Sequence, residues 1–173
     1  MTTINLGSVK VVQSSTSGVQ SRSGNEGTVY ESRPMSHSEL RQLSEPTLLQ
    51  PAQLQSSDMK LARVLKIASS SDDVLGTIVH YKGTNGRWFI IKQFYDKPET
   101  REVPFAFESA TIGGRPAAFY TFTVLAENQP GGMIDLQVFL WEHGPFLLEM
   151  QGALLSRNEL IAIGSSLIGK AVA

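Results

Sequence analysis

The chain has no cysteine among its 173 residues, which excludes a disulfide framework, a thiolate metal site and a cysteine nucleophile. It also has no excess of charge of one sign. Its 15 Lys and Arg residues against 16 Asp and Glu give a formal net charge of -1, which argues against a nucleic-acid-binding surface. No apolar run approaches the roughly 20 residues that span a bilayer, and the polar N-terminus shows no signal peptide. The sequence therefore predicts no nucleic-acid partner and no membrane span in this chain.

The composition changes near residue 34. The preceding residues are mostly Ser, Thr, Gly, Gln and Asn, and Tyr30 is their only aromatic residue. Such a segment buries too little apolar surface to offset its chain entropy. We therefore predict a flexible tail or linker over residues 1–34 and a single α+β domain over residues 35–173. A short edge strand at Val9–Val12 is the alternative for part of the tail.

Two capping boxes predict helix starts, one at each end of the expected domain. Ser36 with Glu39 begins a short helix, because Pro46 disfavours helical geometry before it. Ser156 with Glu159 begins the second helix. The second helix carries an apolar stripe at helical spacing. The stripe comprises Leu160, Ile163 and Leu167.

The residues between the two helices are rich in β-branched and aromatic types and are divided by turn signals. Asn85-Gly86, Gly113-Gly114 and the segment Glu142–Pro145 mark three hairpins. The predicted strands are 60–68, 76–82, 87–95, 109–112, 115–127, 134–141 and 146–152. The predicted fold class is thus α+β: an antiparallel meander sheet of about six strands, packed by the C-terminal helix, with the short N-terminal helix nearby.

No catalytic constellation stands out. His37, His80 and His143 are scattered and lack the spacing of metal ligands. There is no G-x-S-x-G nucleophile elbow, and neither Gly-Gly pair continues into a phosphate-binding Gly-Lys-Ser or Gly-Lys-Thr. We predict that the protein is not an enzyme and has no catalytic, metal-binding or cofactor-binding residues.

Aromatic residues supply the candidate binding surface. The strands around Trp88 and Trp141 are apolar on both faces, which a sheet covered on one side does not require. Either a second layer covers the other face, or part of that face binds a ligand or partner. We favour covering by connectors and the Ser36 helix. The residues of the possible binding surface are Tyr81, Trp88, Phe94, Tyr120 and Trp141.

The order of motifs from about residue 35 to 170 resembles a bacterial domain of unknown function. That domain forms the extracytoplasmic C-terminal part of membrane-anchored anti-sigma factors and of sporulation-associated lipoproteins. The resemblance is carried by Ile78–Tyr81, Trp88–Gln93, Thr111–Ala117, Phe139–Gly152 and Ser156–Leu167. It implies an α+β fold outside the cytoplasm, and it brings no catalytic residues. The upstream membrane helix and zinc-type domain of the anti-sigma members are not in this chain.

These observations lead to three hypotheses of function. The first is a non-enzymatic binding or sensing domain of the bacterial cell envelope, as in the outer part of an anti-sigma or sporulation-type regulator, with a protein, peptide or lipid partner. The second is a ligand carrier or small hydrolase with a pocket between sheet and helix, where His80 and His143 with Glu142 or Glu149 would be the acid–base groups. The third is a protein-partner chaperone or assembly factor. The resemblance implies an extracytoplasmic location, whereas a full-length chain without a leader would be cytoplasmic.

Overall fold

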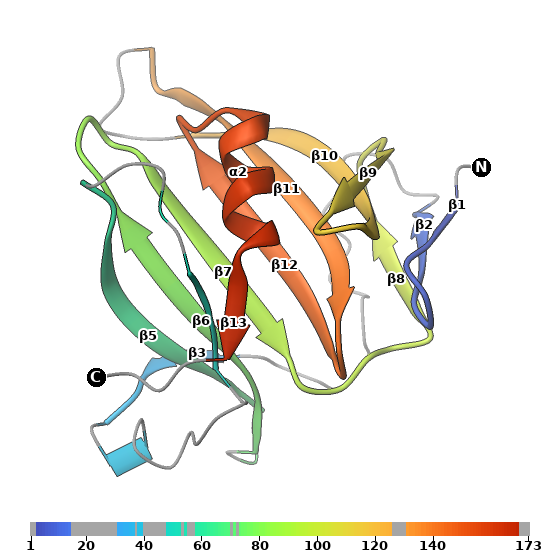
Figure 1. Ribbon diagram of the computed structural model, residues 1–173, viewed down its shortest axis with the longest axis horizontal. Coiled ribbons are helices and arrows are strands. Elements are labelled where there is room, and N and C mark those ends of the chain that lie inside the picture. The colour runs from blue at the N-terminus through green and yellow to red at the C-terminus, as the bar shows by residue number, and fades with distance from the viewer. Residues whose placement is uncertain are drawn as a thin grey trace.

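A computed structural model describes residues 3–14, 31–36, 38–39, 48–52, 54, 58–69, 71, 73–125 and 131–169. Its main element is an eight-stranded antiparallel sheet (Figure 1). In spatial order its strands are β3 (Glu31–Pro34), β5 (Lys60–Ala68), β6 (Val74–Lys82), β7 (Trp88–Phe94), β12 (Phe146–Ala153), β11 (Met133–His143), β10 (Arg115–Leu125) and β9 (Glu108–Ile112). The predicted antiparallel sheet is confirmed, with more strands than the six expected.

The turn and cap signals in the sequence appear in the structure as predicted. Asn85 and Gly86 have positive φ values of 60° and 76°, in a turn that the pairing of Lys82 with Trp88 makes one residue longer than a two-residue hairpin loop. Gly113 and Gly114, with φ values of 57° and 79°, form a two-residue loop between Ile112 and Arg115. Ser156 caps the helix α2 (Arg157–Ser165), and both hydrogen bonds of its capping box are present. The C-terminal helix and the hairpins are therefore confirmed.

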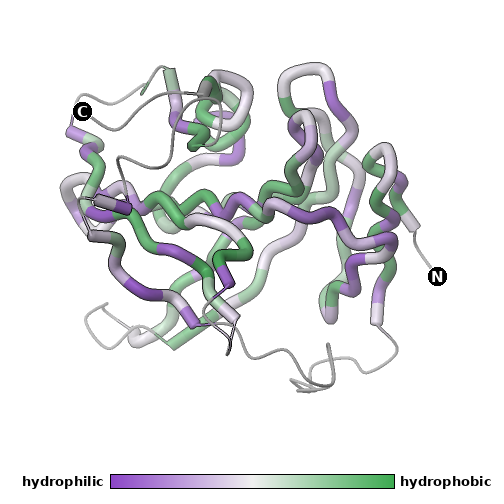
Figure 2. The backbone as a smooth tube through the Cα atoms, turned by 90° about the horizontal axis from the view of Figure 1, so that it is seen from below, coloured by the Kyte–Doolittle hydropathy of each residue, from purple (hydrophilic) through white to green (hydrophobic). Residues whose placement is uncertain are grey.

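One face of the sheet, the helix face, packs against α2 and a small second sheet. That sheet consists of β4 (Leu49–Pro51) and β13 (Leu167–Gly169). Leu160 of α2 lies on Gly152, where an added Cβ would come within 2.6 Å of its side chain. A Cβ on Gly164 would lie 3.1 Å from Ile112 and 3.3 Å from Trp141. The helix is therefore packed directly on the sheet at these positions, and Figure 2 shows it above the strands.

The opposite face, the back face, is covered in part by a three-stranded sheet. Its strands are β1 (Thr3–Asn5), β2 (Lys10–Gln13) and β8 (Thr100–Val103), and β2 pairs with β8 in parallel. The apolar side chains of this layer pack on β10, β11 and β12. They are Ile4, Leu6, Val9, Val11 and Val103. Figure 1 shows β1 and β2 at the opposite end of the molecule from β5 and β6.

The structure differs from two predictions for the N-terminal region. Residues 3–14 are not a tail but a hairpin packed on the back face, and residues 31–34 form β3; residues 15–30 lie outside the described residues. Five of residues 3–14 are apolar, and two of them, Ile4 and Val11, oppose each other across the hairpin and are both buried. The predicted N-terminal helix is not an element of the described structure. Ser36 and Glu39 do make the two capping-box hydrogen bonds, but residues 40–47 lie outside the described residues.

Candidate ligand-binding trough

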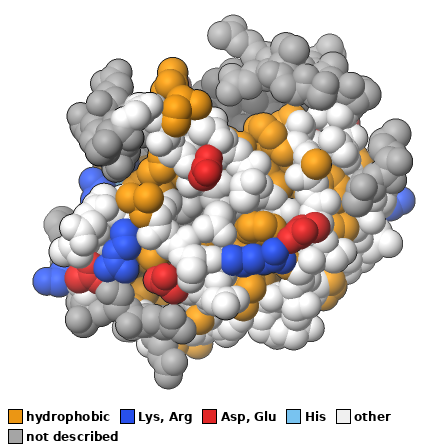
Figure 3. Space-filling view, turned by 90° about the horizontal axis from the view of Figure 1, so that it is seen from above, with side chains coloured by type: hydrophobic (Ala, Val, Ile, Leu, Met, Phe, Trp, Pro, Cys, Tyr) orange, Lys and Arg blue, Asp and Glu red, His pale blue; other side chains and the backbone are white. Residues whose placement is uncertain are grey.

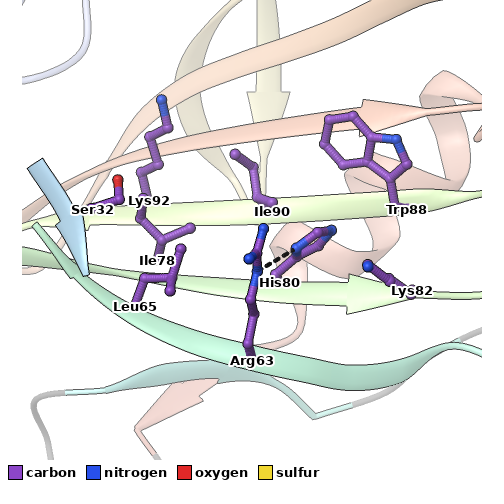
Figure 4. Close-up of a pocket in the computed structure, with 9 residues that line it drawn as sticks. All are labelled: Ser32, Arg63, Leu65, Ile78, His80, Lys82, Trp88, Ile90 and Lys92. Atoms are coloured by element: carbon purple, nitrogen blue, oxygen red, sulfur yellow. Dashed lines mark hydrogen bonds between the residues drawn. The ribbon is translucent and has the colours of Figure 1, made fainter. Parts of the chain in front are cut away.

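The half of the back face formed by β3, β5, β6 and β7 contains a trough of about 530 Å³. This volume lies within the roughly 300–1,000 Å³ typical of sites for small ligands. The β1–β2–β8 layer packs on the neighbouring strands β10, β11 and β12 instead. Figure 4 shows the side chains that line the trough. They are Ser32, Arg63, Leu65, Ile78, His80, Lys82, Trp88, Ile90 and Lys92.

Strand register places the lining residues in three rows across the sheet. Leu65, Ile78 and Lys92 form one row, because Leu65 pairs with Ile78 and Ile78 with Lys92. A second row joins Arg63, His80 and Ile90, and in the third Lys82 pairs with Trp88. Since side chains alternate between faces along a strand, every second residue of β6 and β7 points into the trough.

The middle row holds a hydrogen-bonded pair of side chains. Arg63 donates from Nε to Nδ1 of His80 at 3.2 Å, which requires His80 to be neutral, with its proton on Nε2. Burial lowers the pKa of His80, and the charges of Arg63 and Lys82 lower it further. The His80 ring also meets Trp88 edge-on, with centroids 5.8 Å apart. His80 therefore contributes no charge to the trough but holds the Arg63 guanidinium in place.

A buried charge network closes the trough on the side of β12. Glu149 lies 3.1 Å from Lys92 Nζ and 2.8 Å from the Arg101 guanidinium of β8, and it accepts a hydrogen bond from Gln151 at 2.9 Å. Burial raises the pKa of Glu149, but the two cations outweigh burial and hold the pKa below its usual value. Lys92 is thus ion-paired inside the protein, sharing Glu149 with Arg101, and the network joins the trough to the layer over the other half of the face.

The five aromatic residues of the predicted binding surface do not form one surface. Tyr81 and Trp141 lie on the helix face and are buried in the main core, Trp141 completely. Phe94 and Tyr120 lie on the back face beside the β1–β2–β8 layer. Trp88, half-buried, is the one of the five that lines the trough. The structure therefore separates these aromatic residues and places cations beside Trp88.

The basic side chains of this site were not among the residues predicted from the sequence. Lys82, Trp88 and Lys92 share one sheet face because Lys82 pairs with Trp88. A two-residue turn at Asn85-Gly86 would instead pair Lys82 with Phe89, so the turn signal alone places Lys82 and Trp88 on opposite faces. The face on which Arg63 lies is also not given by the local sequence pattern. An irregularity between Leu61 and Arg63 shifts the register of β5 by one residue.

The histidines are not brought together. His80 lies on the back face of β6, whereas His143 shares the helix face of β11 with Trp141, two residues before it. His37 lies outside the described residues. Glu142 binds the turn at Ser8 and Val9, and Glu149 belongs to the buried network. Across the described ranges, no three His, Asp or Glu side chains are grouped as metal ligands.

None of the helices in the described part of the chain is long and apolar enough to cross a membrane. The chain matches no protein-family model, no curated protein and no solved structure. The interpretation of its function therefore rests on the geometry of the trough and on the motifs of the sequence.

Proposed function

We propose that this protein is a non-enzymatic binding or sensing domain of the bacterial cell envelope, as in the outer part of an anti-sigma or sporulation-type regulator, and that it binds its ligand in the trough. The envelope setting is supported by the resemblance of its motifs. The binding role is supported by one observation. Half of the back face carries apolar side chains that no other described layer covers.

The apolar content of this half would serve no purpose in a sheet that faces only water. Ile78 is buried, while Leu65, Trp88 and Ile90 are half-buried in the floor of the trough. An exposed apolar surface framed by polar side chains is typical of a binding site. Each large side chain that a ligand covered would contribute on the order of 1 kcal/mol of transfer free energy.

A thermal-shift screen against fractions of a bacterial envelope tests this proposal. We expect at least one fraction to raise the Tm of the wild-type protein. The trough variant Ile90→Glu should lose that shift, because it places a carboxylate on the apolar floor. The matched control Thr121→Glu changes an exposed position of β10 outside the trough and should keep it. A screen in which no fraction shifts the wild type, or in which Ile90→Glu responds like the wild type, would refute the proposal.

A further inference from the structure

Building on the proposed function, we infer that the ligand of the trough is a single-chain amphiphile with an anionic headgroup. The headgroup would lie at Arg63 and Lys82, and the chain would lie over Leu65, Ile78, Ile90 and Trp88. The inference depends on four features of the trough: its charge, the arrangement of its apolar side chains, the pairing of its backbone and the position of its tryptophan.

The charge of the trough has one sign. Arg63, Lys82 and Lys92 line it, and none of its lining residues is acidic. Lys92 is ion-paired with Glu149, which it shares with Arg101. Among the described residues, Arg63 has the neutral His80 ring as its one hydrogen-bonding partner, and Lys82 has no hydrogen-bonding or ionic partner. By contrast, Figure 3 shows acidic and basic side chains next to each other on another side of the molecule.

Arg63 and Lys82, two cations without a carboxylate partner among the described residues, suit a small anion. They are too few for the phosphate backbone of a nucleic acid, which proteins contact with many Lys and Arg side chains. Arg63 uses Nε for His80, which leaves the two terminal nitrogens of its guanidinium to donate to a carboxylate or phosphate. His80 is a positioning residue in this arrangement, because it orients Arg63 without touching the ligand.

Apolar side chains lie beside these two cations and in the row beyond Arg63, which ends at Lys92. Lys82 pairs with Trp88 and His80 with Ile90 on neighbouring strands, and the row of Ile78 and Leu65 follows. Figure 4 shows the apolar side chains rising on the same side of the strands as Arg63 and His80. A ligand bound through its headgroup at Lys82 and Arg63 would therefore place its remaining atoms on hydrocarbon.

The backbone of the trough argues against an extended peptide. β6 and β7 pair with a strand on both sides, and β5 pairs with β6 along its length and with β3 over Leu65–Ala68, so most main-chain groups beneath the trough are already hydrogen-bonded. A peptide bound over them could not add as a strand, and its own backbone groups would lose water without gaining partners. A hydrocarbon chain has no such groups to satisfy, and the same apolar floor suits it.

The fluorescence of Trp88 can report binding in the trough, because the second tryptophan, Trp141, is completely buried on the other face. Tryptophan fluorescence would be followed during titration with laurate and dodecyl phosphate below their micelle concentrations. We expect a saturable blue shift for at least one of them, and the comparison shows which headgroup is preferred. Dodecanol and acetate, which carry the chain or the headgroup alone, should bind at least about tenfold more weakly. The variant Trp88→Phe should show no spectral change.

The double variant Arg63→Gln/Lys82→Gln tests the headgroup site. Both side chains are exposed, so the variant is expected to fold, which its unfolding transition would verify. We expect its affinity for the anionic amphiphile to fall on the order of tenfold or more for each cation, with weak dodecanol binding unchanged. The matched control Lys10→Gln removes an exposed cation of β2, outside the trough, and should bind like the wild type.

Three results would overturn the inference. They are equal affinity for laurate and dodecanol, unchanged binding of both anionic amphiphiles by the double variant, and binding to vesicles of anionic phosphatidylglycerol without any response to monomeric amphiphile. The last result would indicate a membrane surface as the partner. If neither amphiphile binds but an envelope fraction still shifts the Tm through Ile90, the proposed function stands and the ligand class is wrong.

Discussion

Glu149 is the buried charge on which the back face depends, and its environment allows a quantitative test. Glu149 is 2% exposed. Its carboxylate oxygens lie 3.1 Å from Lys92 Nζ and 2.8 Å from the Arg101 guanidinium. The two cations are less buried than Glu149, with side-chain exposures of 28% and 36%. Removing both cations as Lys92→Met/Arg101→Met would leave a buried carboxylate with Gln151 as its remaining described partner.

The size of the effect follows from the option of protonation. A Glu with an ordinary pKa of about 4.3 is protonated at pH 7 at a cost of about 3.7 kcal/mol, since each pKa unit corresponds to about 1.36 kcal/mol. This cost limits the electrostatic penalty in the double variant, which we expect to lose about 3–4 kcal/mol of unfolding free energy. Each single variant keeps one cation and should lose about 1.5–2 kcal/mol. Adding Glu149→Met to the double variant removes the unmatched charge and should restore about 3 kcal/mol.

The sign of the pH dependence distinguishes this mechanism from lost packing. In the wild type the pKa of Glu149 is lowered, so its contribution is present above its unfolded pKa and is lost on acidification below about pH 4.3. In the double variant burial acts alone and raises the pKa. The folded protein then takes up a proton more readily than the unfolded chain, so the double variant should recover relative to the wild type by up to about 2.7 kcal/mol between pH 7 and pH 5.

Urea unfolding followed by far-UV circular dichroism at pH 7 and pH 5 measures these differences. The control Glu31→Gln breaks an exposed pair with Arg33 and should change the unfolding free energy by less than about 1 kcal/mol at both pH values. The reasoning fails if the gap between wild type and double variant is the same at both pH values, or if the triple variant is no more stable than the double.

Three further perturbations test other parts of the structure. Glu142 accepts hydrogen bonds from the backbone N–H groups of Ser8 and Val9 at 2.8 and 2.7 Å. Glu142→Gln should therefore lower the unfolding free energy by about 1–3 kcal/mol and speed amide exchange in residues 3–14 more than in β11. Equal exchange in both would show that this carboxylate does not hold the hairpin. Leu154 is half exposed and has a φ of 59°, a conformation that Asn adopts more readily than Leu. Leu154→Asn should relieve about 1 kcal/mol of backbone strain and raise the Tm by roughly 2–4 °C in calorimetry. A lower Tm would contradict this. Burial, Arg63 and Lys82 lower the pKa of His80, so the unfolded chain binds the proton more tightly and stability should fall as the pH drops below about 6.5. His80→Gln should reduce this slope in denaturant titrations, and an unchanged slope would assign the effect elsewhere.

Much of the sheet was predictable because its signals are local. The Asn85-Gly86 and Gly113-Gly114 turns need positive φ, which these residues adopt at low cost. The capping box at Ser156 likewise marks the start of α2 without reference to the rest of the chain. These elements are specified by residues within a few positions of one another.

The β1–β2–β8 layer was not predictable for the opposite reason. β2 pairs in parallel with β8, about 90 residues further along the chain. No local pattern in either strand indicates that the other is its partner. The composition of residues 1–34 as a whole is polar and conceals the apolar residues of the hairpin, of which Val9 and Val11 are almost completely buried. The separation of Tyr81 and Trp141 from Trp88 has a related cause, because residue type does not reveal which face a strand residue occupies.

The same layer defines where the trough ends. Arg101 of β8 binds Glu149 from above, while Lys92 binds it from the trough, so one carboxylate links the covered half of the back face to the open half. Because Lys92 and Arg101 share one carboxylate, Glu149 ties β8, which pairs in parallel with β2, to the strand that lines the trough.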